Sequence, residues 1–382
     1  MNNMNKRTFL SLLLCVCCLS FLHAERVDMQ QAGADVQGRK LNTALINSTI
    51  DRLNAHGGGT LFFPAGTYLT GSIHMKSNIT LELEAGATLK FSENFDDFLP
   101  YVEVRHEGIM MKSFQPLIYA VDAENITIKG EGTLDGQGKA WWTEFFRVLV
   151  DLRDNGKRNI NKYQPMFEKE NDLKALYAET NEDWHGTLDR RFFRPPFIHP
   201  IRCKNVRIEG VKIINSPFWT VNPEFCDNVT IKGITIHNVP SPNTDGINPE
   251  SCKNVHISDC HISVGDDCIT IKSGRDLQAR KLGVPCENIT ITNCTMLSGH
   301  GGVVIGSEMS GSVRKVTISN CVFDGTDRGI RIKSTRGRGG VVEDIRVSNV
   351  VMSNIKQEAV VLNLKYSKMP AEPKSERTPI FR

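Results

Sequence analysis

The chain has 382 residues, of which 40% are hydrophobic and 23% charged, and this composition is usual for a soluble globular protein. Its formal net charge is +3 and falls to about +1 without the first 24 residues. This balance argues against a general nucleic-acid binder, so any attraction to an anionic ligand must come from a local cluster of charge.

Residues 1–24 have the pattern of an export signal. Lys6 and Arg7 form its charged start, residues 8–22 are an apolar run, and Ala24 offers a cleavage point. The alternative is a membrane anchor, but this run is short for crossing a bilayer, and no later run is long enough. We therefore expect a periplasmic or secreted protein whose mature part, residues 25–382, is a soluble monomer with a single domain.

A short helix is predicted at residues 39–56, where apolar residues recur with helical spacing. We expect this helix to cover the open end of the strand structure that follows, which would otherwise expose unpaired backbone groups. The apolar positions are Leu41, Ala44, Leu45, Ile50 and Leu53.

Residues 141–195 interrupt the strand pattern with many charges and several aromatic residues. We expect a partly helical insertion, and either a functional role or a purely packing role fits its composition. The aromatic residues are Trp141, Trp142, Phe145, Phe146, Trp184, Phe192 and Phe193.

A repeated segment occupies much of the chain. Each copy has a turn residue followed by alternating β-branched and polar residues, and no amphipathic helix separates the copies. Successive copies from Cys203 to Cys286 begin 23, 26 and 34 residues apart. Short strands that repeat at this interval predict an all-β solenoid, a parallel β-helix in which like positions stack about 4.8 Å apart. The copies begin at Cys203, Cys226, Cys252, Cys286, Val313 and Val342, with earlier echoes at Ser77 and Glu124.

Stacking of these copies accounts for most of the cysteines. Disulfides would be permitted in an exported protein, but we favour two ladders of buried thiols. The asparagines at one turn position are likewise expected to form a side-chain ladder. The first thiol ladder is Cys203, Cys226, Cys252 and Cys286, the second is Cys260, Cys294 and Cys321, and the asparagines are Asn205, Asn228, Asn254 and Asn288.

The C-terminal residues 378–382 resemble the start of a further coil rather than a cap. We expect either that the last coil lies exposed or that the sequence is an incomplete record.

Four polar clusters recur about once per repeat in the second half of the chain. Their spacings, from Asp245 to Asp266, His300 and Arg331, are 21, 34 and 31 residues, which matches the repeat. If each repeat is one coil, the clusters stack into a single site. The clusters are Asn243-Thr244-Asp245-Gly246, Gly265-Asp266-Asp267-Cys268, Gly299-His300-Gly301 and Arg331-Ile332-Lys333.

The first two clusters bring three carboxylates together, and mutual repulsion should raise the pKa of at least one of them. A protonated and an ionised carboxyl group are the acid and base that glycoside hydrolysis needs. An aspartate-rich turn or a calcium site is the alternative. Because His300 and two cations follow on the next coils, we favour catalysis, with His300 either supporting a proton network or contacting substrate.

Arg331 and Lys333 alternate with Ile332, so both cations are expected on one face while Ile332 packs inward. Two outward cations suit a substrate carboxylate. In a nearly neutral protein, this local charge beside the carboxylates indicates a polyanionic sugar polymer. The patch also includes Arg328, Arg336 and Arg338.

The four clusters, in this order, resemble the signature of family 28 glycoside hydrolases, the polygalacturonases and their relatives. The resemblance covers roughly residues 30–380. Further similar segments are Gly132–Gly138 with Trp141 and Trp142, Ser216–Trp219, and Val304–Ser310.

The resemblance implies a right-handed parallel β-helix that hydrolyses α-1,4 galacturonide linkages in pectin or its oligomers, with inversion and without a metal or other cofactor. By matching positions, Asp266 would be the general acid, Asp245 and Asp267 would activate water, and His300 would support the acid.

The remaining matched residues, Asn243, Arg331 and Lys333, would bind substrate. A step of one coil is nearer the carboxylate separation of retaining enzymes, about 5 Å, than that of inverting ones, roughly 6.5–9.5 Å. We therefore expect side-chain direction to widen the separation, and we expect a turn or bulge at Asp266 and Asp267. Many relatives have a disulfide at the position of Cys268, which is doubtful here.

Action on chain ends is slightly favoured over endo action, because the insertion at residues 141–195 offers a means of closing one end of the cleft. An endo-polygalacturonase and a rhamnogalacturonan hydrolase are the alternatives within the family. A calcium-dependent pectate lyase and a non-catalytic carbohydrate-binding β-helix are the alternatives outside it.

Overall fold

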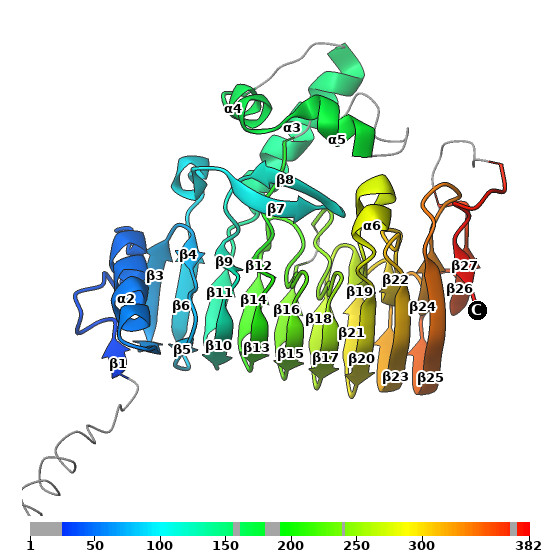
Figure 1. The fold of residues 1–382 in the computed structure, drawn as a ribbon. Helices are drawn as coiled ribbons and strands as arrows, with labels where there is room; N and C mark the ends of the chain where they lie inside the picture. The colour runs from blue at the N-terminus through cyan, green and yellow to red at the C-terminus, as the bar shows by residue number, and fades with distance from the viewer. Residues whose placement is uncertain (1–24, 156–160, 180–191, 239–240, 367–372) are drawn as a thin grey trace, which may run out of the picture.

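The computed structural model describes residues 25–155, 161–179, 192–238, 241–366 and 373–382. The chain winds into successive coils whose strands pair in parallel, giving the right-handed parallel β-helix that was predicted (Figure 1). The predicted export signal lies outside the described residues. Within those residues, no helix is both long and apolar enough to cross a membrane.

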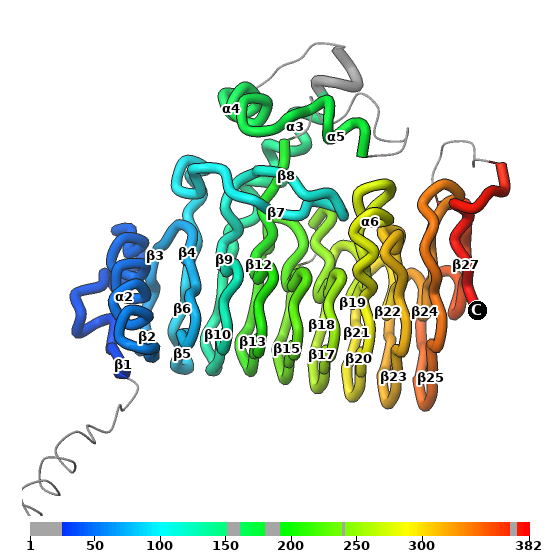
Figure 2. Tube along the Cα trace, viewed as in Figure 1, coloured from blue at the N-terminus to red at the C-terminus, as the bar shows by residue number. Residues whose placement is uncertain are grey.

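Three strand faces run the length of the solenoid, as the tube in Figure 2 follows coil by coil. The first face contains β1 (Glu25–Asp28), β2 (Gly59–Phe63), β5 (Ile79–Leu83), β10 (Glu124–Gly130), β13 (Lys204–Glu209), β15 (Asp227–Lys232), β17 (Lys253–Ser258), β20 (Cys286–Thr292) and β27 (Ile380–Phe381). The second contains β3 (Gly66–Thr70), β6 (Ala87–Phe91), β11 (Thr133–Asp135), β14 (Lys212–Ile214), β16 (Thr235–His237), β18 (His261–Ser263) and β21 (Thr295–Ser298). The long strands β23 (Val313–Asp324) and β25 (Val341–Ser353) continue both faces.

The third face carries the polar clusters. Where its strands are interrupted, Val221 and Ile247 continue the pairing as single bridges. Its strands are β4 (Ile73–His74), β9 (Ile118–Val121), β12 (Ile198–Ile201), β19 (Asp267–Ile271), β22 (Gly301–Ile305), β24 (Ile330–Lys333) and β26 (Val360–Asn363).

The predicted repeat register is confirmed. Val206 pairs with Val229, Val229 with Val255, and Val255 with Ile289, each from one coil to the next. The stacked apolar side chains form one continuous core along the axis, and their burial is the main stabilising contribution.

The asparagine and cysteine ladders also form. Asn228 donates from Nδ2 to Asn205 Oδ1 at 2.8 Å, whereas Asn254 donates to Asp227 instead, so the ladder has one break. These asparagines have φ near +57°, a left-handed conformation that asparagine tolerates better than most residues. All eight cysteines of the described residues are buried and free, Cys268 included.

Helix α2 (Thr43–Ala55) covers the first coil, as predicted for residues 39–56. Ile46, Ile50 and Leu53 are buried against the core, whereas Leu41 precedes the helix and is exposed. At the other end β27 pairs with β25 as the start of another coil. Several apolar side chains of this last part are exposed, among them Val347, Val351, Val360 and Leu362.

The insertion is helical, and its first aromatic residue belongs to the main core: Trp141 is fully buried. An antiparallel hairpin that the sequence analysis did not predict lies before the insertion, formed by β7 (Val102–His106) and β8 (Ile109–Ser113). The helices are α3 (Lys139–Asn155), α4 (Tyr163–Glu170) and α5 (Leu173–Glu179), with α6 (Asp276–Leu282) and a 3-10 helix (Phe95–Phe98) elsewhere. Trp184 lies outside the described residues.

The thiol ladders give a first testable prediction. A chain lacking residues 1–24 should show no thiol that reacts rapidly while it is folded, because every remaining cysteine is buried, and eight reactive thiols once it is unfolded without reductant. A colorimetric thiol titration measures both values. Six or fewer thiols in the unfolded chain would indicate a disulfide and contradict the ladder interpretation.

Candidate active site

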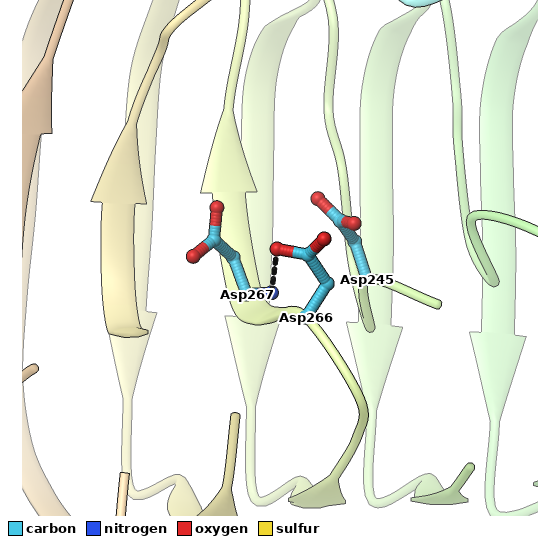
Figure 3. Close-up of side chains that lie close together, drawn as sticks. All are labelled: Asp245, Asp266 and Asp267. Carbon is cyan, nitrogen blue, oxygen red and sulfur yellow. Dashed lines mark hydrogen bonds between the residues drawn. The ribbon is translucent and has the colours of Figure 1, made fainter. Parts of the chain in front are cut away.

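The stacking of coils brings the three aspartates together. Asp245 and Asp267 occupy the same position on adjacent coils, since Ile247 pairs with Ile269 two residues later. One carboxylate oxygen of each of Asp245, Asp266 and Asp267 lies within 4.8 Å of the others. Figure 3 shows the three carboxyl groups side by side, with Asp266 on the bend before β19.

The predicted turn at the paired aspartates is present. Asp266 lies in a bend, β19 begins at Asp267, and the Asp267 backbone N–H donates to Asp266 Oδ1 at 3.0 Å. The next residue, Cys268, is fully buried in the core. The expectation that side-chain direction widens the separation of the carboxyl groups stays a prediction, because the 4.8 Å joins only one oxygen of each group.

His300 is on the next coil beside Asp266. Its Nδ1 lies 3.1 Å from Asp266 Oδ1, and its backbone N–H donates to the Asp266 carbonyl at 2.8 Å. The flanking glycine is required by this close approach, since a Cβ at Gly299 would lie 2.5 Å from the Asp266 carbonyl oxygen. The imidazole is half exposed, and His300 is not among the residues that line the cleft.

The predicted cations lie on the other side of the carboxylates. Lys333 is buried, with Nζ 2.6 Å from Asp267 Oδ2, whereas Arg331 is partly exposed, and Ile332 packs inward as expected. Both cations lie near the ring of Tyr366, at 4.9 Å from Lys333 Nζ and 5.5 Å from Arg331 Cζ. Tyr366 follows the last strand of this face, outside every cluster, so no local signal identified it.

Asn243 is held by the end of the insertion. Arg194 Nη2 donates to Asn243 Oδ1 at 2.7 Å, and Arg194 Nη1 donates to the carbonyl oxygens of Pro217 and Pro242. The predicted site residues Asn243, Asp245, Asp266, Asp267 and Lys333 thus line one cleft.

The cleft has a volume of about 310 Å³ and includes residues to which the sequence analysis gave no role. Lys272 directly follows the strand that Asp267 begins, and its Nζ lies 2.7 Å from Glu308 Oε2 and 4.5 Å from the Trp219 ring centroid. Trp219 and Glu308 belong to segments that supported the family resemblance, but spacing did not show which way their side chains face. The remaining wall residues are Glu107, Arg275, Ser307, Arg338 and Tyr366.

Burial and neighbouring charges shift the pKa values of Asp245 and Asp266 in opposite directions. Burial, and then the charge of Asp266, raises the pKa of Asp245 well above its usual range. For Asp266, burial is opposed and outweighed by the hydrogen bond from His300 and the charge of Lys333, so its pKa is lowered. Without substrate, the cluster therefore holds a proton more readily on Asp245 than on Asp266.

The carboxylates also form the one group of acidic, histidine or cysteine side chains, among the described residues, that is placed to share a metal ion. Their oxygens would suit a hard cation. Lys333 Nζ already contacts Asp267 at 2.6 Å, however, and Lys272 also acts on Asp245 through its charge. These two ammonium groups supply the positive charge that a metal would otherwise bring.

The hairpin β7–β8 covers the third face on the N-terminal side of the carboxylates. Figure 1 shows it lying across the coils between β9 and α6, with the insertion helices above it. Beneath it, outward-facing polar residues are completely buried. They are His199, Asn222, Glu224, Asn248 and Glu250.

The insertion packs both on this hairpin and on the solenoid, since Trp141 and Phe192 belong to the main core. Phe167, Leu176 and Phe193 form a separate small core with Val104 and Met111 of the hairpin. The hairpin turn contributes Glu107 to the cleft wall, and residues 141–195 support the hairpin.

Comparison with known proteins agrees with this geometry. The family model described as glycosyl hydrolases family 28 matches residues 184–378. The chain belongs to this family. An endo-polygalacturonase of Pectobacterium parmentieri is 32% identical over 332 residues, which is 84% of this chain and 73% of the relative.

Two further matches bear on length and fold. A probable polygalacturonase of Vitis vinifera is 32% identical over 87% of this chain, and the chain spans 62% of that relative. The crystal structure of a hyperthermoactive exopolygalacturonase from Thermotoga maritima matches with a TM-score of 0.79 and 38% identity, covering 91% of this chain and 77% of that one.

The buried carboxyl groups under the hairpin predict a pH-dependent stability. Burial, and then the neighbouring Glu250, raises the pKa of Glu224 well above its ordinary 4.5, while Arg105 opposes this shift. The folded chain thus keeps a proton that the unfolded chain loses. The resulting stability is complete below pH 4.5 and is lost as the pH rises through the folded-state pKa.

Glu224→Gln should therefore flatten the decline of stability above pH 4.5, where this group contributes up to about 1.4 kcal/mol per pH unit. Unfolding free energies from urea titrations, from weakly acidic to neutral pH, measure the slope. Equal slopes in the variant and the wild type would show that Glu224 does not hold this proton.

Proposed function

We propose that this chain hydrolyses α-1,4 galacturonide linkages in polygalacturonate, releasing sugar from chain ends with inversion at the anomeric carbon. The observation that carries the proposal is the carboxylate cluster of Asp245, Asp266 and Asp267, flanked by His300 and Lys333, in a family 28 chain. The names of the endo- and exo-acting relatives support the substrate class.

In the proposed reaction Asp266 gives its proton to the leaving glycosidic oxygen. Asp245 and Asp267, at equivalent positions of adjacent coils, hold the attacking water between them. Once the proton of Asp245 has moved to Asp266, one of these two carboxylates accepts the proton of the water. His300 lies 3.1 Å from Asp266 and keeps its carboxyl group oriented, and it is exposed enough to exchange protons with solvent.

Substrate binding itself would prepare the acid. The charge of Lys333 is one of the causes that keep the pKa of Asp266 low. A galacturonate carboxylate bound by Arg331 and Lys333 would offset that charge, raise the pKa of Asp266 and so favour its protonated form. The acid would thus be ready only when a negatively charged sugar is in place.

Action on chain ends is supported by the sealed face beneath the hairpin. A polymer crossing all coils would need the outer surface of the sheet on both sides of the carboxylates, but Asn222 and Asn248 are fully buried there. Glu107, at the hairpin turn, forms part of the cleft wall. The substrate chain would therefore enter from the side of Tyr366 and end near Glu107.

The site of action is proposed to be outside the cytoplasm, in the periplasm or beyond the cell. The leader-like residues 1–24 and a polymeric plant cell-wall substrate support this location. Residues 25–382 are proposed to act as a single monomeric catalytic domain, because one core runs through all the coils.

Asp266→Asn should lower the release of reducing ends from polygalacturonate by about 10²–10⁴-fold, because the amide cannot supply the proton. Binding of the polymer should persist. Reducing-end assays with a chelator present, together with ultraviolet absorbance, measure the loss and separate hydrolysis from a lyase reaction. Asp344→Asn, an exposed aspartate on β25, is the matched control and should retain activity. Unchanged activity in Asp266→Asn would remove its proposed role.

The time course of products tests the mode of action. Chromatography of a polygalacturonate digest should show small sugar, monomer above all, from the earliest samples, because only a chain end fits a cleft closed at Glu107. Nuclear magnetic resonance of the first product should show the inverted anomer. Mixed oligomers at the outset would indicate endo action, and no product would point to a rhamnogalacturonan substrate.

A further inference from the structure

The hairpin β7–β8 is attached to the solenoid at three levels. At its base, Tyr119 Oη donates to the Glu103 carbonyl at 2.9 Å. At its tip, the Arg275 backbone N–H donates to the Gly108 carbonyl at 3.1 Å. Between these points the hairpin passes over two coils of the third face, where the side chain of Arg105 reaches the sheet.

Arg105 is 1% exposed and fills a socket built by both coils. Its Nε lies 3.4 Å from Glu250 Oε1, and its Nη1 donates to Ser251 Oγ at 3.1 Å. The guanidinium also lies over the Phe225 ring, with Cζ 4.7 Å from the centroid. Gly274 leaves the remaining space, because a Cβ there would lie 1.6 Å from Arg105 Nη2.

The residues that form this socket have no role in the hydrolysis proposed above. Glu224 and Glu250 are fully buried, and their carboxylate oxygens have no hydrogen-bond partner among the described residues. Buried carboxyl groups are costly unless a charge compensates them, and Arg105 is a cation that acts on both. The contact of Arg105 with Glu250 therefore stabilises the docked position of the hairpin. Release of the hairpin would leave the buried carboxyl groups without a compensating charge.

We propose that Arg105 is a positioning residue that fixes the hairpin over the third face and so restricts the enzyme to chain ends. The inference rests on the proposed chain-end hydrolysis. It assigns the choice between end and internal cleavage to the contact of Arg105 with Glu250, outside the reacting groups. When this contact is lost, the hairpin loosens and internal stretches of a polymer gain access across the coils.

The test compares wild type, Arg105→Ala, Arg105→Lys and the control Lys112→Ala on polygalacturonate. Lys112 is an exposed cation of the same hairpin, paired with Glu170. Arg105→Ala should lower viscosity several-fold more per reducing end released than the wild type does, and should release mixed oligomers early. Arg105→Lys should restore part of the wild-type profile, and Lys112→Ala should match the wild type.

A folded Arg105→Ala protein that still releases only terminal sugar would overturn the inference. If that variant does not fold, Glu250→Gln decides, because it keeps the side-chain volume but removes the charge that Arg105 contacts, and it should also shift products toward oligomers. A wild-type enzyme that releases mixed oligomers from the start would instead contradict the chain-end proposal itself, before any variant is compared.

Discussion

The parallel register of the coils is the constraint on which the rest of this protein depends. Because Val206, Val229 and Val255 pair in sequence, every residue at a given repeat position is brought beside its counterpart. One ladder of hydrogen bonds thus builds the core, the asparagine ladder and the active site. A change of register would separate Asp245 from Asp267 and turn inward-facing residues out.

Close stacking of like positions creates an electrostatic difficulty that the structure resolves with buried cations. Three carboxyl groups within 4.8 Å cannot all ionise without compensation. Against the effect of burial, His300 and Lys333 lower the pKa of Asp266, so the cluster holds a proton more readily on Asp245. The same solution recurs beneath the hairpin with Arg105 and Glu250. Substrate carboxylates would enter a site whose proton distribution already depends on local cations.

The hairpin and the insertion have a different role from the stacked strands. The coils place the reacting groups, whereas the hairpin determines how much of the third face remains open. The insertion supports the hairpin through Phe167 and Phe193, and Arg194 fixes Asn243. Relatives with endo and exo names both match most of this chain, so such additions are where a difference in action can arise without a change in the catalytic cluster.

The sequence alone determined the β-helix, its register, the thiol ladders and the residues of the carboxylate cluster. It could do so because residues that share a position in the repeat lie beside one another on adjacent coils. It did not predict the hairpin, Tyr366, or the partners of Lys272 and Glu308. These belong to unrepeated segments, whose position depends on packing between residues far apart in the chain. The difference in pKa between Asp245 and Asp266 also needed the tertiary structure, since burial and the distances to neighbouring charges set it.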